Sequence, residues 1–497
     1  MVNQSKQTKT WYERYFWWCL LAGILAAMGI SLLVGLVHSV WFDEAYSIML
    51  AKRPVGDLLY LTGIDTHPPF YYLLLKVWAS IFGWSEVALR SLSVLAMGGA
   101  ALIGILLVKR VFGVRTAMMT LPFVILAPFL LRYGFEIRMY ALASLIGIAA
   151  TYTLIIALES RGRRQWLFYI CYAALVALGV FTLYYTVLLW ITHVIWLIWR
   201  TVREGKPVLK QKWWLAYVGS IVLFLPWLPT FLKQIGNGAL APISQQMTTE
   251  NMIGIVSFWF LYQPAWQLNG ISSLVIVAII TTIVYIVVQA FRNVSVMQKQ
   301  FYILFAFYAG MPVGLIALIS LFRPMYVERY LAHVLIGFGL FLGVSVWLAF
   351  QKQPQRVRLL ALSLIAVSFY GAVHVAASGN YNFQRLQLPQ TREVAEFIGC
   401  SKDRPILAAD PYVAIELSYY ITHCDIYFYS DTAELKGGYA PLAYSSLRVA
   451  NPAEKFKETN KLTYVYYDKS QLSLPSRLQA NKDITFGPLH VQTLSVE

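Results

Sequence analysis

The chain has 497 residues, of which 58% are hydrophobic and only 13% charged, and its formal net charge is +16 at pH 7. Together with a mean hydropathy of +0.59, this composition excludes an ordinary soluble domain, in which about a quarter of the residues are charged. Apolar runs long enough to cross a bilayer as helices recur from the N-terminus to about residue 377. The sequence therefore predicts a polytopic α-helical membrane protein.

The apolar runs predict eleven membrane-spanning helices. The first run, 17–40, is too long for the core of a secretory signal peptide and shows no clear small-residue cleavage site, so we interpret it as a retained span. The predicted spans are 15–40, 87–108, 117–135, 138–158, 165–183, 185–200, 213–233, 271–291, 300–321, 328–350 and 357–377.

Basic residues are distributed unequally between the connections of these spans. The N-terminal side holds 19 Lys and Arg residues, and the opposite side holds 9 before residue 379. The positive-inside rule places the side with more basic residues in the cytoplasm. We therefore expect a protein of the inner or plasma membrane with a cytoplasmic N-terminus. The positive net charge then reflects topology, and no nucleic-acid partner is implied.

The first external loop, 41–86, holds five of the acidic residues that precede residue 379. The loop is aromatic and proline-containing, and we expect it to fold back on the membrane surface. Two adjacent acids open it, and a His-Pro-Pro sequence at 67–69 precedes an aromatic run. The five acidic residues are Asp43, Glu44, Asp57, Asp65 and Glu86.

The composition changes near residue 378, which predicts two domains, 1–378 in the membrane and 379–497 outside it. The second part alternates between helical and strand patterns, which predicts a small extracytoplasmic α/β domain with a partly parallel sheet. Helices are expected at 391–399, 411–421 and 452–460, and strands at 404–410, 425–430 and 461–468.

Two of the four cysteines, Cys400 and Cys424, lie in this external part. An oxidising compartment permits them to form a disulfide, and two free thiols are the alternative. Cys19 and Cys171 lie in apolar spans, where a buried thiol is the ordinary interpretation.

The acidic pair after the first span, the His-Pro-Pro sequence and the segments "RYGFEIRMYAL" (132–142), "LYY" (183–185) and "RPMYVERYL" (323–331) resemble the membrane glycosyltransferases of GT-C fold. The chain is most similar to the protein O-mannosyltransferases, glycosyltransferase family 39, and to their bacterial relatives that transfer aminoarabinose to lipid A. The resemblance covers about residues 15 to 350. It implies transfer of a sugar, usually with inversion, from a polyprenyl-phosphate donor to an acceptor on the outer face.

This chemistry gives the acidic pair a role at the membrane surface. An acceptor hydroxyl must lose a proton as it attacks the anomeric carbon, so a carboxylate is needed within hydrogen-bonding distance. We interpret Asp43 as this general base, and an N-cap of the following helix is the alternative. Glu44 either shapes the catalytic site or favours the helix N-terminus electrostatically.

Cationic groups are expected near the donor phosphate, which leaves as an anion. Arg138 and Arg329 are the candidates. The alternatives are membrane anchoring for Arg132 and Arg138, and a local ion pair with Glu328 for Arg329. His67 is expected to bind phosphate, to help Asp43 hold a metal, or only to order the Pro-Pro turn.

Tyr184 and Tyr185 are expected to line the substrate pocket or to belong to an interfacial aromatic belt. His193, within a span, is interpreted as a packing residue. The cofactor is unknown, with a divalent metal ion as one alternative, because Thr66 stands where the lipid A enzymes have an acidic residue.

The sequence thus predicts a glycosyltransferase that uses a polyprenyl-phosphate sugar, undecaprenyl phosphate being the carrier in a bacterial host. The acceptor is a protein, a glycolipid or a wall polymer. A transporter or flippase of lipid-linked sugars is the alternative, although we find none of the internal repeats or charged midplane helices typical of transporters.

Overall fold

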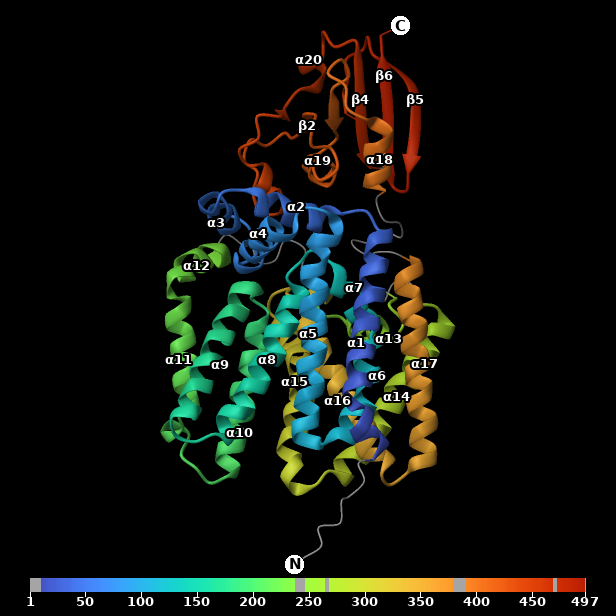
Figure 1. Cartoon of the computed structure of the whole chain (residues 1–497). Coiled ribbons are helices and arrows are strands. Elements are labelled where there is room, and N and C mark those ends of the chain that lie inside the picture. The colour runs from blue at the N-terminus through green and yellow to red at the C-terminus, as the bar shows by residue number, and fades with distance from the viewer. Residues whose placement is uncertain (1–9, 237–245, 264–267, 379–389, 468–471, 497) are drawn as a thin grey trace, which may run out of the picture.

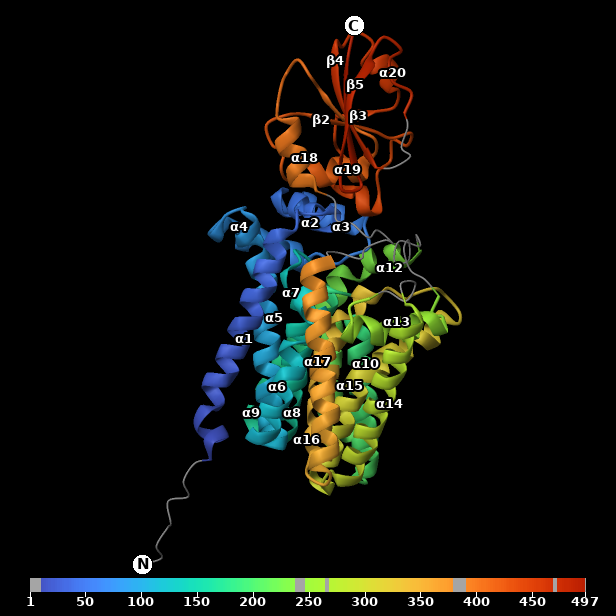
Figure 2. The ribbon, with the colours of Figure 1, turned by 90° about the vertical axis from the view of Figure 1, so that its right-hand side faces the viewer.

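A computed structural model describes residues 10–236, 246–263, 268–378, 390–467 and 472–496 (Figure 1). The chain forms a helical bundle, a layer of short helices above it, and a small sheet above that layer (Figures 1 and 2). The bundle helices are α1 (Trp11–Val37), α5 (Glu86–Phe112), α6 (Val114–Ile125), α7 (Pro128–Phe135), α8 (Tyr140–Glu159), α9 (Gly162–Thr182), α10 (Thr186–Arg203), α11 (Trp213–Phe224), α12 (Leu228–Gly236), α13 (Thr249–Phe260), α14 (Gly270–Asn293), α15 (Val296–Ser320), α16 (Ala332–Phe350) and α17 (Pro354–Ser378).

Nine helices within the described ranges are long and apolar enough to cross a membrane, or ten if the bent pair α6 and α7 forms one span. The two helices of this pair meet at 65°. The remaining predicted span, 185–200, corresponds to α10, which has only 18 residues and carries Arg200 and Arg203 in its last turn. The prediction of a multi-pass helical membrane protein is confirmed, and α10 is the span whose length and composition are marginal.

The first loop forms three short helices, α2 (Phe42–Lys52), α3 (Val55–Gly63) and α4 (Phe70–Phe82). They lie between the bundle and the sheet (Figures 1 and 2). Prolines and a glycine set their limits: Pro54 and Pro69 occupy the N-cap positions of α3 and α4, and Gly83 ends α4 with φ at 92°. Such a φ favours glycine because a side chain is strained there. The loop therefore forms a compact layer over the bundle.

The C-terminal part forms a six-stranded sheet in the order β3-β2-β1-β4-β6-β5. The four strands β3, β2, β1 and β4 are parallel, and β4, β6 and β5 are antiparallel. The elements are α18 (Thr391–Ile398), β1 (Ile406–Ala408), α19 (Pro411–Leu417), β2 (Ile426–Tyr429), β3 (Arg448–Val449), α20 (Pro452–Lys455), β4 (Lys461–Tyr467), β5 (Gln479–Phe486) and β6 (Leu489–Ser495).

The predicted helices and strands of this part are confirmed, as is the partly parallel sheet. The short strand β3 and the hairpin of β5 and β6 were not predicted from the sequence. The strand β5 is an exposed edge strand with a polar sequence, so it lacks the apolar alternation that reveals a strand. The domain boundary predicted at 378 stays a prediction, because residues 379–389 lie outside the described ranges.

The predicted topology can be tested with single cysteines at positions 205 and 430. The helix α1 begins at the end of the bundle opposite the sheet (Figure 1). With the 19-to-9 asymmetry of basic residues, this predicts residue 205 inside the cell and residue 430 outside. An impermeant maleimide should label position 430 in intact cells and position 205 only after permeabilisation. Labelling of both positions in intact cells would contradict the topology.

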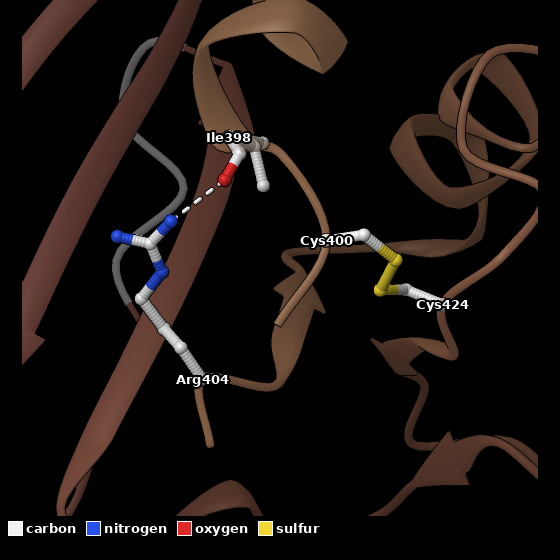
Figure 3. Close-up of a disulfide and its surroundings, with 4 residues drawn as sticks. All are labelled: Ile398, Cys400, Arg404 and Cys424. Carbon is white, nitrogen blue, oxygen red and sulfur yellow. Dashed lines mark hydrogen bonds between the residues drawn. A yellow bond between two sulfur atoms is a disulfide. The ribbon is translucent and has the colours of Figure 1, made fainter. Parts of the chain in front are cut away.

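The structure joins Cys400 and Cys424 by a disulfide, with Cα atoms 5.8 Å apart (Figure 3). Cys400 follows α18, where Gly399 turns the chain with φ at 59°. Nearby, Nη2 of Arg404 donates a hydrogen bond of 2.7 Å to the carbonyl oxygen of Ile398 (Figure 3). The disulfide connects the end of α18 to the chain just before β2.

We expect replacement of both cysteines by serine to lower the free energy of unfolding by about 3 kcal/mol, because the bond closes a loop of moderate length. Peptide mapping without reductant should show the two cysteines linked. Complete alkylation of both thiols in the unreduced protein would contradict the bond.

Candidate active site

Asp43 and Glu44 occupy the first turn of α2, and both side chains are buried, with exposed fractions of 6% and 1%. The N-cap residue of this helix is Trp41, and it makes no side-chain capping hydrogen bond. The alternative interpretation of Asp43 as the N-cap is therefore wrong. A buried aspartate at this position needs partners from elsewhere in the fold.

Two arginines surround the carboxylate of Asp43. Oδ2 of Asp43 lies 3.6 Å from Nη2 of Arg329 and 3.8 Å from Nε of Arg138. Among the described residues this oxygen has no hydrogen-bond partner. Arg329 belongs to the 3-10 turn Glu328–Leu331, and Arg138 follows α7. Ion pairs at these distances hold the carboxylate in place.

Both arginines are buried, with exposed fractions of 2% for Arg138 and 7% for Arg329. Membrane anchoring therefore does not describe Arg138, since its guanidinium does not reach the surface. Arg329 forms its ion pair with Asp43, which differs from the local pair with Glu328 that the sequence left open. The two arginines and Asp43 thus form one charged centre beneath the loop helices.

Glu44 forms a bidentate ion pair with Arg90 of α5, at 3.2 Å from Nε and 2.8 Å from Nη2. Its Oε1 also accepts a hydrogen bond of 3.1 Å from the backbone N–H of Ile137. Arg90 further contacts Glu86 and the carbonyl oxygens of residues 35 and 38. Glu44 therefore connects α2 to α5 and to the turn that carries Arg138.

His67 lies between Asp65 and Arg138. Its Nδ1 is 3.2 Å from Oδ2 of Asp65, and its Nε2 is 3.3 Å from Nη2 of Arg138. An ionised carboxylate only accepts and a guanidinium only donates, so the proton belongs on Nδ1 and Nε2 accepts from Arg138. Tyr330 approaches the same Nε2 at 3.3 Å. The histidine therefore orients Arg138 and Tyr330.

The pKa values of these two loop groups agree with this assignment. Burial, followed by the positive charge of Arg138, lowers the pKa of His67, so the imidazole is neutral at pH 7. Burial alone would raise the pKa of Asp65, but hydrogen bonds from His67 and Tyr46 hold it below its ordinary value. The Tyr46 hydroxyl lies 2.5 Å from Oδ2 of Asp65. Asp65 is therefore ionised.

A cavity of about 310 Å³ adjoins this centre. His67 and Tyr330 line it beside the charged centre, and Arg323 also lines it, while most of the remaining lining is apolar. Apart from Pro68, the apolar residues come from α10, α12, α15 and their flanking segments; they are Leu183, Val187, Leu188, Phe231, Ile235, Ile316, Ile319 and Met325. The cavity therefore has one polar side and apolar walls at the top of the bundle.

Tyr184 and Tyr185 both line this cavity. The Tyr184 hydroxyl donates to Oε1 of Gln234 at 2.7 Å, and the Tyr185 hydroxyl donates to the carbonyl oxygen of Met325 at 2.6 Å. The ring of Tyr185 meets that of Tyr330 edge-on, with centroids 4.9 Å apart. Their hydroxyls thus hold the cavity walls together, and their rings face its interior.

The other sequence candidates lie in separate contacts. Arg132 pairs with Glu136 at 3.4 Å, both buried. His193 is buried between Thr151 and Tyr172, at 3.1 and 2.9 Å, which confirms its interpretation as a packing residue. Within the described ranges no group of three His, Cys, Asp or Glu side chains could hold a metal ion.

No role in the site was predicted from the sequence for Arg90, Asp65 and Tyr330. Asp65 could have been recognised because it stands two residues before His67, within reach of the imidazole. Arg90 lies one turn after Glu86 at the start of an apolar helix, where a buried arginine requires an acidic partner. No sequence signal identifies Glu44 as that partner, because the pairing depends on how α2 lies on α5.

Comparisons with known proteins agree with the resemblance. Residues 66–229 match the family model described as dolichyl-phosphate-mannose-protein mannosyltransferase. The solved structure of ArnT from Cupriavidus metallidurans in the apo state matches 97% of this chain and 98% of its own, with a TM-score of 0.64 and 12% identity. The same protein bound to undecaprenyl phosphate matches with a TM-score of 0.60, at 12% identity, over 96% of this chain and 98% of its own.

The oligosaccharyltransferase of Archaeoglobus fulgidus in its apo form is also similar, with a TM-score of 0.51 and 12% identity over 84% of this chain and 65% of its own. No curated protein sequence matches the chain. The matched region begins at Thr66, so Asp43 and Glu44 lie outside it. The chain has the GT-C fold of these membrane enzymes, and its match to the mannosyltransferase model indicates that it is a glycosyltransferase.

Proposed function

We propose that the chain transfers a sugar from a polyprenyl-phosphate donor to an acceptor on the outer face of the membrane, with Asp43 as the general base. The observation that carries the proposal is the apolar cavity lined by His67 and Tyr330, because His67 contacts Arg138, which is one of the two arginines paired with Asp43. A prenyl chain needs apolar walls, and its phosphate needs cationic partners at the polar side. Undecaprenyl phosphate bound to ArnT supports the same class of carrier.

In the proposed reaction, Asp43 accepts the proton of an acceptor hydroxyl as that oxygen bonds to the anomeric carbon. The bond between the anomeric carbon and the phosphate oxygen breaks, and polyprenyl phosphate leaves. One displacement of this kind inverts the anomeric configuration. Arg138 and Arg329 stabilise the negative charge that develops on the leaving phosphate.

The ion pairs of Asp43 suggest how donor binding activates the base. A carboxylate that is paired with two guanidinium groups is held by both of them, which limits its access to the proton of an acceptor hydroxyl. A donor phosphate competes for the same arginines, because a phosphate offers them more oxygen acceptors. Drawing the arginines toward the donor would weaken their hold on Asp43 and leave its carboxylate to meet the acceptor hydroxyl. His67, fixed by Asp65, would keep Arg138 and Tyr330 oriented during this exchange.

We expect Arg138→Gln and Arg329→Gln to weaken donor use far more than acceptor use. Arg138→Lys and Arg329→Lys should rescue only partly, because a point charge does not reproduce the planar guanidinium fork. Steady-state kinetics with each substrate varied in turn will measure this. Arg110→Gln, in an exposed ion pair with Glu159, is the matched control. Unchanged donor dependence in both Gln variants would contradict a role in phosphate binding.

The proposal is tested by incubating membranes that contain the protein with radiolabelled polyprenyl-phosphate sugars and identifying the labelled product. We expect the label to leave the lipid and appear on a protein, a glycolipid or a wall polymer. A transporter of lipid-linked sugars would instead move the intact labelled lipid between leaflets. Translocation of intact lipid without transfer would contradict the proposal.

A further inference from the structure

The segment that precedes Asp43 is held by the C-terminal part of the chain. The backbone N–H of Val40 donates to the hydroxyl of Tyr420 at 2.7 Å, and Oγ1 of Thr391 donates to the carbonyl oxygen of Val40 at 3.0 Å. The ring of Phe42 stacks on that of Tyr412, with centroids 4.1 Å apart and planes 1° from parallel. Residues nearly four hundred positions apart therefore meet at the start of α2 (Figures 1 and 2).

Glu416 of α19 contacts the first residue of α2 directly. Its Oε1 accepts a hydrogen bond of 3.2 Å from the backbone N–H of Phe42. The first N–H groups of a helix have no partner within the helix, and Trp41 at the N-cap supplies none from its side chain. A carboxylate at this end is also favoured by the helix dipole. Glu416 thus supplies the cap that the local sequence of α2 lacks.

Glu416 is itself fixed in one orientation. It has an exposed fraction of 0%, and its Oε2 accepts a hydrogen bond from the hydroxyl of Tyr467 at the end of β4. A buried carboxylate with two donors has little freedom to move. Two hydrogen bonds, from Tyr467 to Glu416 and from Phe42 to Glu416, therefore connect the sheet to Phe42, the residue directly before Asp43.

We propose that Glu416 is a positioning residue for Asp43, so that the C-terminal part of the chain completes the active site; this inference rests on the proposed role of Asp43. A displacement of a catalytic group by about 1 Å can lower a rate by about 100-fold. Without the cap, the first turn of α2 frays and Asp43 loses its fixed distance from Arg138 and Arg329.

The test compares three full-length variants. Glu416→Leu combined with Tyr467→Phe removes the cap and leaves no hydroxyl unpaired beside the new leucine. Tyr467→Phe alone keeps the carboxylate that accepts from Phe42 and removes only the hydroxyl that orients it, so it separates the loss of this hydroxyl from the loss of the cap. Glu416→Gln keeps an oxygen acceptor for the Phe42 N–H and is the conservative variant.

We expect the double variant to lower kcat about 10- to 100-fold with an unchanged KM for the donor lipid. Amide hydrogen exchange in peptides that cover 40–46 should become faster, since the cap no longer protects the first turn. Glu416→Gln should retain most of kcat and the slow exchange, and Tyr467→Phe should lie between Glu416→Gln and the double variant. In an Asp43→Asn background, the double variant should lower the residual rate no further, because Glu416 acts through Asp43.

Unchanged exchange in the double variant would overturn the capping role. An equal loss of kcat with and without Asp43 would overturn positioning, because it would reveal a general effect on the fold. Failure of the proposed role of Asp43 would give a different result, because Asp43→Asn alone would then retain full activity. The exchange measurement would still report whether Glu416 holds α2.

Discussion

Asp43→Asn is expected to lower transfer by roughly 10²- to 10⁴-fold, the usual contribution of a general base. The amide has nearly the same size as the carboxylate but cannot accept the acceptor proton. Asp43 lies between Arg138 and Arg329, and the loss of its charge removes a competitor of the donor phosphate for both arginines. The KM for the donor should therefore stay the same or fall. Steady-state kinetics on the purified variant will measure both quantities.

Asp57→Asn is the matched control, because Asp57 is an exposed acid in the same loop region. It should retain full activity and full donor dependence. Comparable thermal unfolding of both variants would show that the fold is intact. Near-normal turnover in purified Asp43→Asn would remove Asp43 from the mechanism.

Of all the substitutions proposed, Arg90→Leu is expected to lower the free energy of unfolding most. The guanidinium neutralises two acids, Glu44 and Glu86, and both its own side chain and that of Glu44 are fully buried. Removing one partner of a buried ion pair costs about 3–5 kcal/mol, because the remaining charge stays buried without compensation. A second arginine, Arg392, still pairs with Glu86 at 2.8 Å, so the uncompensated charge falls mainly on Glu44.

Arg110→Leu is the control for this variant. Arg110 pairs with Glu159, but both side chains are 40% exposed, so its loss should cost about 1 kcal/mol or less. Thermal unfolding in detergent should show a much lower midpoint for Arg90→Leu than for Arg110→Leu. Replacing Glu44 by leucine as well should recover part of the loss, since both charges are then absent. Equal midpoints for the two single variants would contradict the account of Glu44 as a structural partner of Arg90.

The membrane-spanning helices could be predicted from the sequence because each is a long apolar run whose length matches the thickness of the bilayer. The marginal case, α10, is also the one whose run is shortened by two arginines. The alternation of helix and strand predicted the parallel half of the sheet. The antiparallel hairpin could not be predicted, because the polar strand β5 depends on pairing with β6 for its conformation.

The sequence could predict several residues of the site, but it could predict few of the contacts between them. Asp43, Arg138 and Arg329 stood out as charges at the ends of apolar runs, and the structure brings them together. The roles of Glu44 and His67 depended on partners that are distant in sequence, such as Arg90. The cap supplied by Glu416 could not be foreseen, because nothing in α19 indicates which helix its carboxylate will meet.

Photo-cross-linking of the donor carrier tests most directly the central claim, that a lipid-linked donor occupies the cavity beside Asp43. The purified protein would be irradiated with a polyprenyl phosphate that carries a diazirine near its head group, and the labelled peptides identified. We predict labelling of 183–188 and 316–325, which line the cavity, and its loss when unlabelled polyprenyl phosphate competes. Labelling confined to the outer surfaces of α1 and α14, unaffected by the competitor, would contradict the account.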